Sequence, residues 1–460
     1  MQPLQASNTA SRRPGANAST RANKAHSADK EESLKRTADV FGIHSGKSMM
    51  SFHLIDKSCH RRKEEVSLVR RFFQANGWTE AAAVEKADCV ILFTCAEMRY
   101  KEANMIREVE RLSALVGRDA ELIVGSCLPK TNEEALAKVF HGRTITPTDF
   151  SALNALPGIK IKIEDMPSIF GKDAAFRPLA RRISWSAGGA VPYGLSRWTA
   201  RMVRRHVPLA GLKPVAARLA RTRRMVIYVS AGCANHCSYC AIRFATGEIR
   251  SKPLDVVMRN ISEGLRLGYR TFDLLSDSIG GYGLDLGANL GELFDRILAH
   301  PGRFAIGVSD LHPREFIKYF GKILSLCEAG RMHYLYVPVQ SGNERILRMM
   351  NRPCDVKDLT AKLLAIRKFK EVFLQTGIMV GFPGETEAEF EDSLDFLKTV
   401  GFDNVYVHYY CDMPNTESSR LPDKTDKAVM VERLEKISRS GIRYNVAKTR
   451  VEWESTLAIP

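Results

Sequence analysis

Apolar residues in the first third of the chain alternate between two patterns. Short apolar runs at 51–56, 89–93 and 122–124 predict buried strands. Between them, apolar residues at helical spacing predict helices over 64–75 and 98–116. This alternation of strand and helix predicts a doubly wound α/β domain over residues 49–160, with a parallel sheet covered by helices on both faces.

The second half of the chain repeats the alternation on a larger scale. Six strands are predicted at 225–229, 271–275, 304–308, 332–337, 372–380 and 404–409. The helices predicted between them lie at 254–267, 290–299, 313–327, 356–370 and 387–399. Six such units predict a partial (β/α)6 barrel over 225–445, with its chemistry at the carboxyl ends of the strands.

Three other segments lack a periodic apolar pattern. Residues 1–48 are rich in small and polar residues and predict a disordered tail, which we favour over an organelle transit peptide. Residues 446–460 are expected to form a C-terminal tail. The connector 161–224 is basic, with twelve Lys or Arg and no Asp or Glu from 177 to 224. It could bind RNA, a membrane face or an acidic peptide, or simply wrap the next domain.

Charge and cysteine content narrow the setting of the protein. The 460 residues carry a formal net charge of +16, which favours polyanionic partners. No apolar run approaches the roughly 20 residues of a membrane span, so no transmembrane segment is expected. Ten cysteines without a secretion signal favour a reducing, cytoplasmic location, with cysteines as metal ligands or buried side chains.

Cys233, Cys237 and Cys240 follow the first strand of the predicted barrel with the spacing CxxxCxxC. One loop can thereby place three thiolates on one iron–sulfur cluster and leave one iron open. A structural zinc site is the alternative, but it would require a fourth ligand at a second paired spacing. His236 is badly placed to be that ligand.

A second set of cysteines is spread along the first domain. Cys59, Cys95 and Cys127 each stand just beyond a predicted strand, so they can converge at one sheet edge, where ligands bind. The other cysteines have no such placement. Cys89, Cys327 and Cys354 are expected to be structural, and Cys411 to be a buried thiol rather than an extra ligand or substrate contact.

Several motifs resemble those of the methylthiotransferase family of radical S-adenosylmethionine (SAM) enzymes. They are residues 231–240 (AGCANHCSYC), with aromatic Tyr239 before the last cysteine, 337–352 (VPVQSGNERILRMMNR) and 380–390 (VGFPGETEAEF). Residues 282–285 and the region around Cys95 fit as well. Members of this family carry two 4Fe–4S clusters and attach a methylthio group to an unactivated carbon of a tRNA base or a ribosomal protein.

The resemblance implies roles for particular residues. The Cys233, Cys237 and Cys240 cluster would bind SAM at its open iron and cleave it with one electron from a flavodoxin- or ferredoxin-type reductant. The Cys59, Cys95 and Cys127 cluster would hold the sulfur that is methylated and transferred. The residues implied in SAM binding are Tyr239, beside the adenine, and Asp277, Gln340, Ser341, Val380 and Gly381.

The chain departs from the family pattern at several places. Arg62 and Phe93 stand where the family usually has asparagine, and residues 275–277 read Leu-Ser-Asp instead of Thr-Gly-Gln. Gly377 replaces an acidic residue, and the loop 410–416 differs. The family's C-terminal RNA-binding TRAM domain would begin near Pro460, where the sequence stops.

These departures lead us to expect the same chemistry on a different substrate, a small molecule or peptide rather than tRNA. Four alternatives stay open. Two are enzymes, namely a tRNA methylthiotransferase and a radical SAM enzyme whose first cluster only transfers electrons. The other two are a basic RNA-binding module with structural metal and a plain electron-transfer protein.

Overall fold

The computed structural model describes residues 50–117, 119–168, 170, 179–180 and 224–446. The described residues from Ser51 onward group into one compact unit. The predicted tail 1–48 and nearly all of the C-terminal tail 446–460 lie outside the described residues, as does most of the basic connector 161–224.

A parallel five-stranded sheet forms the first part of this unit, in the order β2-β1-β3-β4-β5. Its strands are β1 (Ser51–Asp56), β2 (Thr79–Glu80), β3 (Cys89–Thr94), β4 (Glu121–Ser126) and β5 (Arg143–Thr144). Its helices are α2 (Lys63–Ala75), α3 (Arg99–Leu115), α4 (Leu128–Thr131) and α5 (Glu133–Ala137). The three long strands and two long helices lie where the apolar pattern predicted them.

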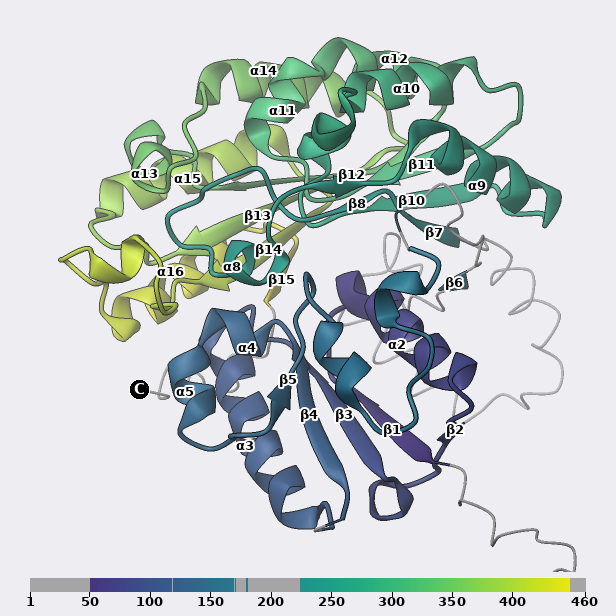
Figure 1. Cartoon of the computed structure of the whole chain (residues 1–460). Helices are drawn as coiled ribbons and strands as arrows, with labels where there is room; N and C mark the ends of the chain where they lie inside the picture. The colour runs from purple at the N-terminus through teal and green to yellow at the C-terminus, as the bar shows by residue number, and fades with distance from the viewer. Residues whose placement is uncertain (1–49, 118, 169, 171–178, 181–223, 447–460) are drawn as a thin grey trace, which may run out of the picture. The chain divides into compact units, whose positions relative to one another are not determined.

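The two long helices cover opposite faces of this sheet (Figure 1). On one face, Phe73 of α2 stacks on Phe52 of β1 with ring centroids 4.7 Å apart. On the other face, Val109 and Leu112 of α3 join a buried cluster with Leu92 of β3. The doubly wound fold predicted for this region is therefore confirmed.

The second sheet has eight strands in the order β15-β14-β13-β12-β11-β10-β7-β6. They are β6 (Leu179–Ala180), β7 (Arg224–Tyr228), β10 (Thr271–Leu275), β11 (Ala305–Val308), β12 (Met332–Gln340), β13 (Phe373–Val380), β14 (Asn404–Tyr409) and β15 (Tyr444–Val446). From β7 to β15 all neighbours pair in parallel, and β6 pairs antiparallel with β7. The six strands β7 and β10–β14 are the six predicted ones, which confirms the partial barrel.

Helices connect the barrel strands, and most of them pack on the outer side of the barrel, whereas α8 packs against α4 of the first part. They are α8 (Ile242–Thr246), α9 (Leu254–Arg266), α10 (Leu290–Ala299), α11 (Pro313–Lys318), α12 (Phe320–Glu328), α13 (Glu344–Met349), α14 (Val356–Ile366), α15 (Glu387–Val400) and α16 (Lys427–Arg439). The single helix predicted over 313–327 was wrong: Tyr319, with φ −102° and ψ 16°, separates α11 from α12. The helix predicted over 356–370 ends at Ile366, four residues early.

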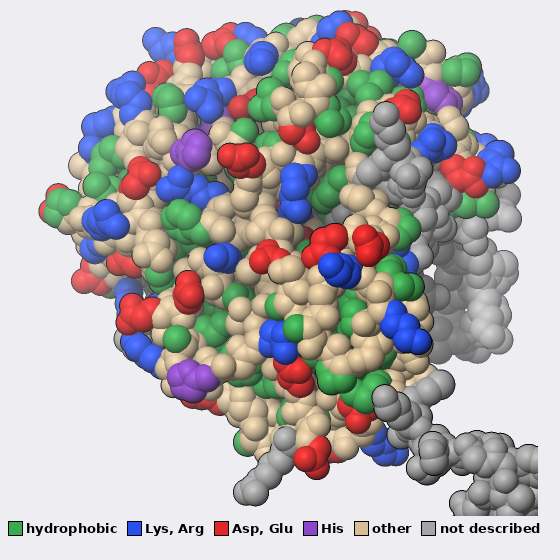
Figure 2. All heavy atoms as spheres, viewed as in Figure 1, with side chains coloured by type: hydrophobic (Ala, Val, Ile, Leu, Met, Phe, Trp, Pro, Cys, Tyr) green, Lys and Arg blue, Asp and Glu red, His purple; other side chains and the backbone are tan. Residues whose placement is uncertain are grey.

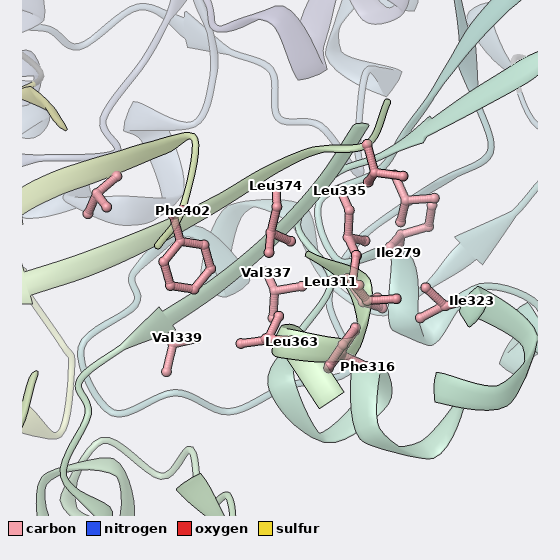
Figure 3. Packing of buried hydrophobic residues seen from close by; sticks show 14 of the residues in the cluster. Ile279, Leu311, Phe316, Ile323, Leu335, Val337, Val339, Leu363, Leu374 and Phe402 are labelled. Carbon is pink, nitrogen blue, oxygen red and sulfur yellow. The ribbon is translucent and has the colours of Figure 1, made fainter. Parts of the chain in front are cut away.

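Successive side chains of β12 point alternately toward the surrounding helices and toward the inner face of the barrel. Leu335, Val337 and Val339 are buried and point to the helices, where Leu363 of α14 and Phe316 of α11 pack against them (Figure 3). Tyr334, Tyr336, Pro338 and Gln340, the intervening residues, are only partly buried and line the other face. The inner face of the barrel is therefore polar and aromatic.

Charges of both signs are mixed over the face shown in Figure 2, with no large patch of one sign among the coloured side chains. None of the helices that the structure describes is long and apolar enough to cross a membrane.

Candidate active site

Cys59, Cys95 and Cys127 lie at one edge of the first sheet. The strands β1, β3 and β4 that precede them are direct neighbours and run parallel. Cys95 and Cys127 directly follow β3 and β4, and Cys59 is three residues beyond the end of β1. Parallel strands bring their carboxyl ends to the same edge, so the three thiols face one region.

These thiols interact with one another. The Cys95 thiol donates a hydrogen bond to the sulfur of Cys59, which lowers the pKa of Cys59 to about 6 and raises that of Cys95. Burial raises the pKa of Cys127 to about 12, although the charge of Arg62 opposes the shift. A cationic side chain therefore lies near the thiols that would become thiolate ligands.

A side-chain hydroxyl and a backbone turn hold Cys95 and Cys127 in place. The Thr94 hydroxyl is fully buried, donates to Gly125 O at 2.6 Å and accepts from Leu128 N at 3.1 Å, which ties the ends of β3 and β4 together. Ser126 has φ +77°, a left-handed conformation that turns the chain sharply before Cys127. Such strain is typical of functional sites.

The Cys233, Cys237 and Cys240 loop follows β7 and the short strand β8 (Ser230–Ala231), which pairs antiparallel with β9 (Arg250–Ser251). Gly232 precedes the loop with φ +85°, and an added Cβ would lie 1.9 Å from Glu248 O. The hairpin therefore passes so close to the loop that only glycine fits here.

Sulfur atoms in this loop accept hydrogen bonds from the protein. Asn235 N lies 3.4 Å from Cys233 Sγ, and Arg352 Nη1 lies 3.3 Å from Cys237 Sγ. Burial, and then the nearby Cys237 and Cys233, raise the pKa of Cys240 to about 12. N–H donors stabilise thiolate ligands, so these residues fit an iron–sulfur cluster. Arg352 is in a motif noted in the sequence, but no role was predicted for it.

The thiols are not arranged around a single ion. Among the residues that the structure describes, no three His, Cys, Asp or Glu side chains are close enough to hold one metal ion. A cubane needs a wider arrangement, since each cysteine binds a different iron. Both sets of cysteines suit this arrangement, and their assignment as ligands remains a prediction.

The residues predicted to contact SAM divide into two groups. Tyr239, Gln340 and Gly381 form the first group, and their roles in SAM binding also remain predictions. Tyr239 is packed beside Cys237, to which its side chain is hydrogen bonded. Gln340 has φ +79°, and its buried Oε1 has no hydrogen-bond partner in the described part of the chain. Gly381 has φ +83° at the end of β13, where an added Cβ would meet Met430 of α16 at 2.6 Å.

The other three have their polar groups engaged within the protein. The Ser341 hydroxyl lies 3.3 Å from Ser393 Oγ and accepts from Asn343 N, as a turn residue does. Both carboxylate oxygens of Asp277 are used, one by Gly232 N at 2.9 Å. Val380 is buried, and its carbonyl accepts from Tyr410 N. Their roles in SAM binding remain predictions.

A buried ion pair connects the two cysteine sets. Arg62 donates from Nη1 to Glu65 at 2.6 Å and from Nη2 to the second oxygen of Asp277. Arg62 and Asp277 were noted in the sequence as separate departures from the family pattern. Their contact could not be predicted, since 215 residues separate them.

A second charged network lies beside the inner face of the barrel. Arg61 donates to Asp310 at 2.6 Å and lies 4.0 Å from Glu97. Although burial opposes it, Lys101 and Arg61 lower the pKa of Glu97 to about 2. Tyr336 and His408 interact electrostatically with this network. It therefore joins loops of the first sheet to the inner face of the barrel, which the sequence analysis did not predict.

The remaining cysteines differ in their surroundings. Cys89 begins β3 and Cys327 lies in α12, and both are buried. Cys354 is partly buried and lines an open pocket of about 490 Å³ with Arg314 and Asp358. Cys411 follows β14, and burial raises its pKa to about 11.

Family models match both parts of the chain. The radical SAM superfamily matches residues 227–397, and the uncharacterized protein family UPF0004 matches residues 52–146. The first match includes the Cys233, Cys237 and Cys240 loop, and the second includes Cys59, Cys95 and Cys127.

Relatives resemble the chain over most of its length. The probable threonylcarbamoyladenosine tRNA methylthiotransferase of Archaeoglobus fulgidus is 27% identical over 368 residues, covering 79% of this chain and 77% of the relative. The tRNA-2-methylthio-N(6)-dimethylallyladenosine synthase of Caldicellulosiruptor saccharolyticus is 27% identical over 420 residues, covering 88% and 80%.

A solved structure agrees with the fold. The radical SAM methyltransferase TsrM of Kitasatospora setae superimposes with a TM-score of 0.52 and 13% identity, covering 81% of this chain and 75% of that one. The chain therefore carries a radical SAM domain and a UPF0004 domain, and over most of its length it is similar to tRNA methylthiotransferases; the cofactors that these matches indicate are SAM and 4Fe–4S clusters.

Proposed function

We propose that this enzyme replaces hydrogen by a methylthio group on an unactivated carbon, with SAM and two 4Fe–4S clusters. The observation that carries the proposal is the pairing of two cysteine sets at carboxyl strand ends, connected through Arg62 and Asp277. An enzyme using one cluster would not require three further cysteines at equivalent strand ends.

When bound, SAM and the clusters supply the radical and the sulfur for this reaction. Cys233, Cys237 and Cys240 would hold one cluster, and the N–H groups of Asn235 and Arg352 would stabilise two of those sulfurs. Cys59, Cys95 and Cys127 would hold the other. Gln340 Oε1, at the end of β12, has no hydrogen-bond partner among the described residues and would be an acceptor available to SAM.

The inner face of the barrel offers a place for the substrate. Tyr336 and Tyr406 meet edge to face with centroids 5.9 Å apart, and His408 lies 6.2 Å from Tyr406. Asp310 and Arg61 add charged hydrogen-bonding groups beside them. Aromatic side chains that accompany hydrogen-bonding groups suit an extruded nucleobase, which proteins read by stacking and by its polar edge.

We infer that a tRNA nucleoside is the first substrate to test. The named relatives act on tRNA, and they cover most of the chain. The net charge gives independent support: residues 1–49 carry eight basic and four acidic residues, and 177–224 carry twelve basic and none acidic. These two segments account for the entire net charge of +16, and cationic segments bind nucleic-acid backbones. The small molecule or peptide predicted from the sequence has no comparable support.

The cofactor assignment can be tested without knowing the substrate. Wild type and a variant with Cys59, Cys95 and Cys127 all changed to Ala would be reconstituted anaerobically and given SAM with dithionite. We expect about eight irons in wild type and about four in the variant, with 5′-deoxyadenosine formed by both. S-adenosylhomocysteine should form only in wild type, by methylation of the sulfur. About four irons in wild type and no S-adenosylhomocysteine would leave only the radical reaction.

The substrate is tested with unmodified tRNA. After incubation with wild type, nucleosides from the digested tRNA would be analysed by mass spectrometry for an added methylthio group, with the triple cysteine variant as control. Binding of the same tRNA should weaken steeply with salt. If no nucleoside gains the group while S-adenosylhomocysteine is formed, the chemistry stands and the tRNA assignment fails. A flavodoxin- or ferredoxin-type reductant remains a prediction.

A further inference from the structure

Among the residues that the structure describes, Arg62 is the largest fully buried charged side chain, with 1% of its surface exposed. It lies at the start of α2, three residues after Cys59. Burying a guanidinium costs several kcal/mol unless its charge and its N–H groups find partners. Its partners therefore indicate what holds it there.

Two carboxylates occupy the ends of the guanidinium. Nη1 donates to Glu65 Oε1 at 2.6 Å, and Nη2 donates to Asp277 Oδ1. The other oxygen of Asp277 accepts from Gly232 N, the residue before Cys233. A continuous chain of hydrogen bonds thus runs from α2 in the first sheet to the cysteine loop of the barrel.

The third nitrogen of the guanidinium is Nε. Arg62 Nε is buried and has no hydrogen-bond partner in the described residues. Buried N–H groups nearly always have an acceptor. Cys127 and Cys59 lie close enough to Arg62 to interact with its charge. A cluster on these cysteines would bring sulfur atoms into this region, and sulfur can accept the missing hydrogen bond.

We propose that Arg62 is a positioning residue for the cluster at Cys59, Cys95 and Cys127, which takes the Nε hydrogen bond on one of its sulfurs. This inference rests on the proposed function only in requiring that cluster. The Arg62 charge raises the reduction potential of the cluster, since net charge and hydrogen bonds to sulfur set that potential. Asp277 partly neutralises Arg62 and connects it to the loop of the other cluster.

The proposal is tested by the reduction potential, with all variants carrying Cys233, Cys237 and Cys240 changed to Ala so that one cluster remains. The midpoint reduction potential would be measured by reductive titration, monitored by electron paramagnetic resonance. Arg62→Gln should shift the midpoint to a more negative value because a positive charge and an N–H donor are lost. Asp277→Asn should shift it to a more positive value because the charge of Arg62 is less compensated.

Two further variants serve as controls. Arg62→Lys keeps the charge without the Nε geometry and should lie between wild type and Arg62→Gln. Arg367→Gln removes a partly buried arginine paired with Asp403, at the opposite ends of the barrel strands, and should leave the midpoint unchanged.

The outcomes separate this inference from the proposed function. If Arg62→Gln fails to fold because it leaves Glu65 and Asp277 buried without a partner, the triple variant Arg62→Gln/Asp277→Asn/Glu65→Gln removes both charges. It should still show a more negative midpoint reduction potential than Asp277→Asn/Glu65→Gln. A cluster that loads with about four irons but keeps its midpoint in every variant overturns the role of Arg62 and leaves the function intact. Failure of the background protein itself to load a cluster overturns both.

Discussion

Gly232 offers a sharp test of how the barrel positions its cysteine loop. It has φ +85°, its N–H donates to Asp277, and an added Cβ would lie 1.9 Å from Glu248 O and 2.9 Å from Gly247 O. Gly77, which follows α2, has nearly the same torsion, φ +79°, but no atom within 4 Å of an added Cβ. Alanine at Gly77 therefore tests the torsion alone, and alanine at Gly232 tests the torsion together with the contact.

The expected losses differ accordingly. A left-handed non-glycine residue costs about 1–2 kcal/mol, which is the whole effect expected for Gly77→Ala. At Gly232 the obstacle is backbone, so the β8–β9 hairpin must move away from the loop. Overpacking of this kind adds about 1–3 kcal/mol, and the hydrogen bond from Cys233 N to Gly247 O at 3.2 Å would be lost at about 1 kcal/mol more. We expect Gly232→Ala to lose about 3–6 kcal/mol in all.

Urea unfolding of the apoproteins would measure these losses, and iron content after reconstitution would locate them. Gly77→Ala should bind as much iron as wild type, whereas Gly232→Ala should bind about half, because the Cys233, Cys237 and Cys240 loop is displaced. Equal losses of stability in the two variants, with full iron in both, would refute the close approach of the hairpin to the loop.

Three other substitutions have expected effects. Arg433→Met should lose about 3–5 kcal/mol in urea unfolding, because it leaves Glu385, 2.8 Å from Arg433 Nη1, buried without its partner. The double variant Arg433→Met/Glu385→Leu should recover most of the lost stability. A double variant no more stable than Arg433→Met would contradict this reasoning. Burial lowers the pKa of Lys252 to about 8, so the folded protein holds this proton more weakly than the unfolded chain does. The free energy of unfolding should therefore rise with pH from about pH 8 toward the ordinary lysine pKa. Lys252→Met should abolish that rise and stabilise the protein at pH 7. Thr94→Val should lose about 1–3 kcal/mol of stability and bind less iron, because two buried backbone groups lose their hydrogen-bond partner. Unchanged iron content would show that the Cys95 and Cys127 loops do not depend on the Thr94 hydroxyl.

The long elements and the cysteine placements could be predicted because their signals are local. The apolar run of β10 matches its observed bounds, Thr271–Leu275, and the helix α10 matches Leu290–Ala299. Cys95 and Cys127 directly follow β3 and β4, so identifying a strand also located its cysteine. These features need only the period of the side chains and the rule that parallel strands end at one edge.

The features that were missed depend on chain segments far apart in the sequence. The hairpin β8–β9 has two residues in each strand, too few to show a period. The break between α11 and α12 leaves the apolar spacing intact, because Tyr319 continues the buried side across the change of axis. The pairing of Arg61 with Asp310 joins residues 249 positions apart, so no window of sequence contains both.

Departures from the family pattern that look independent in the sequence are coupled in space. Arg62 and Asp277 replace neutral residues of the family and form one buried ion pair, in which either charge without the other would cost several kcal/mol. Gly377 and Tyr336 are related in the same way, since a Cβ at Gly377 would lie 2.7 Å from the Tyr336 hydroxyl. The acidic side chain of the family and this tyrosine would therefore compete for one space. The first pair adjoins the cysteines and the second lies on the inner face of the barrel, so we expect the first to change the cluster and the second to change the substrate.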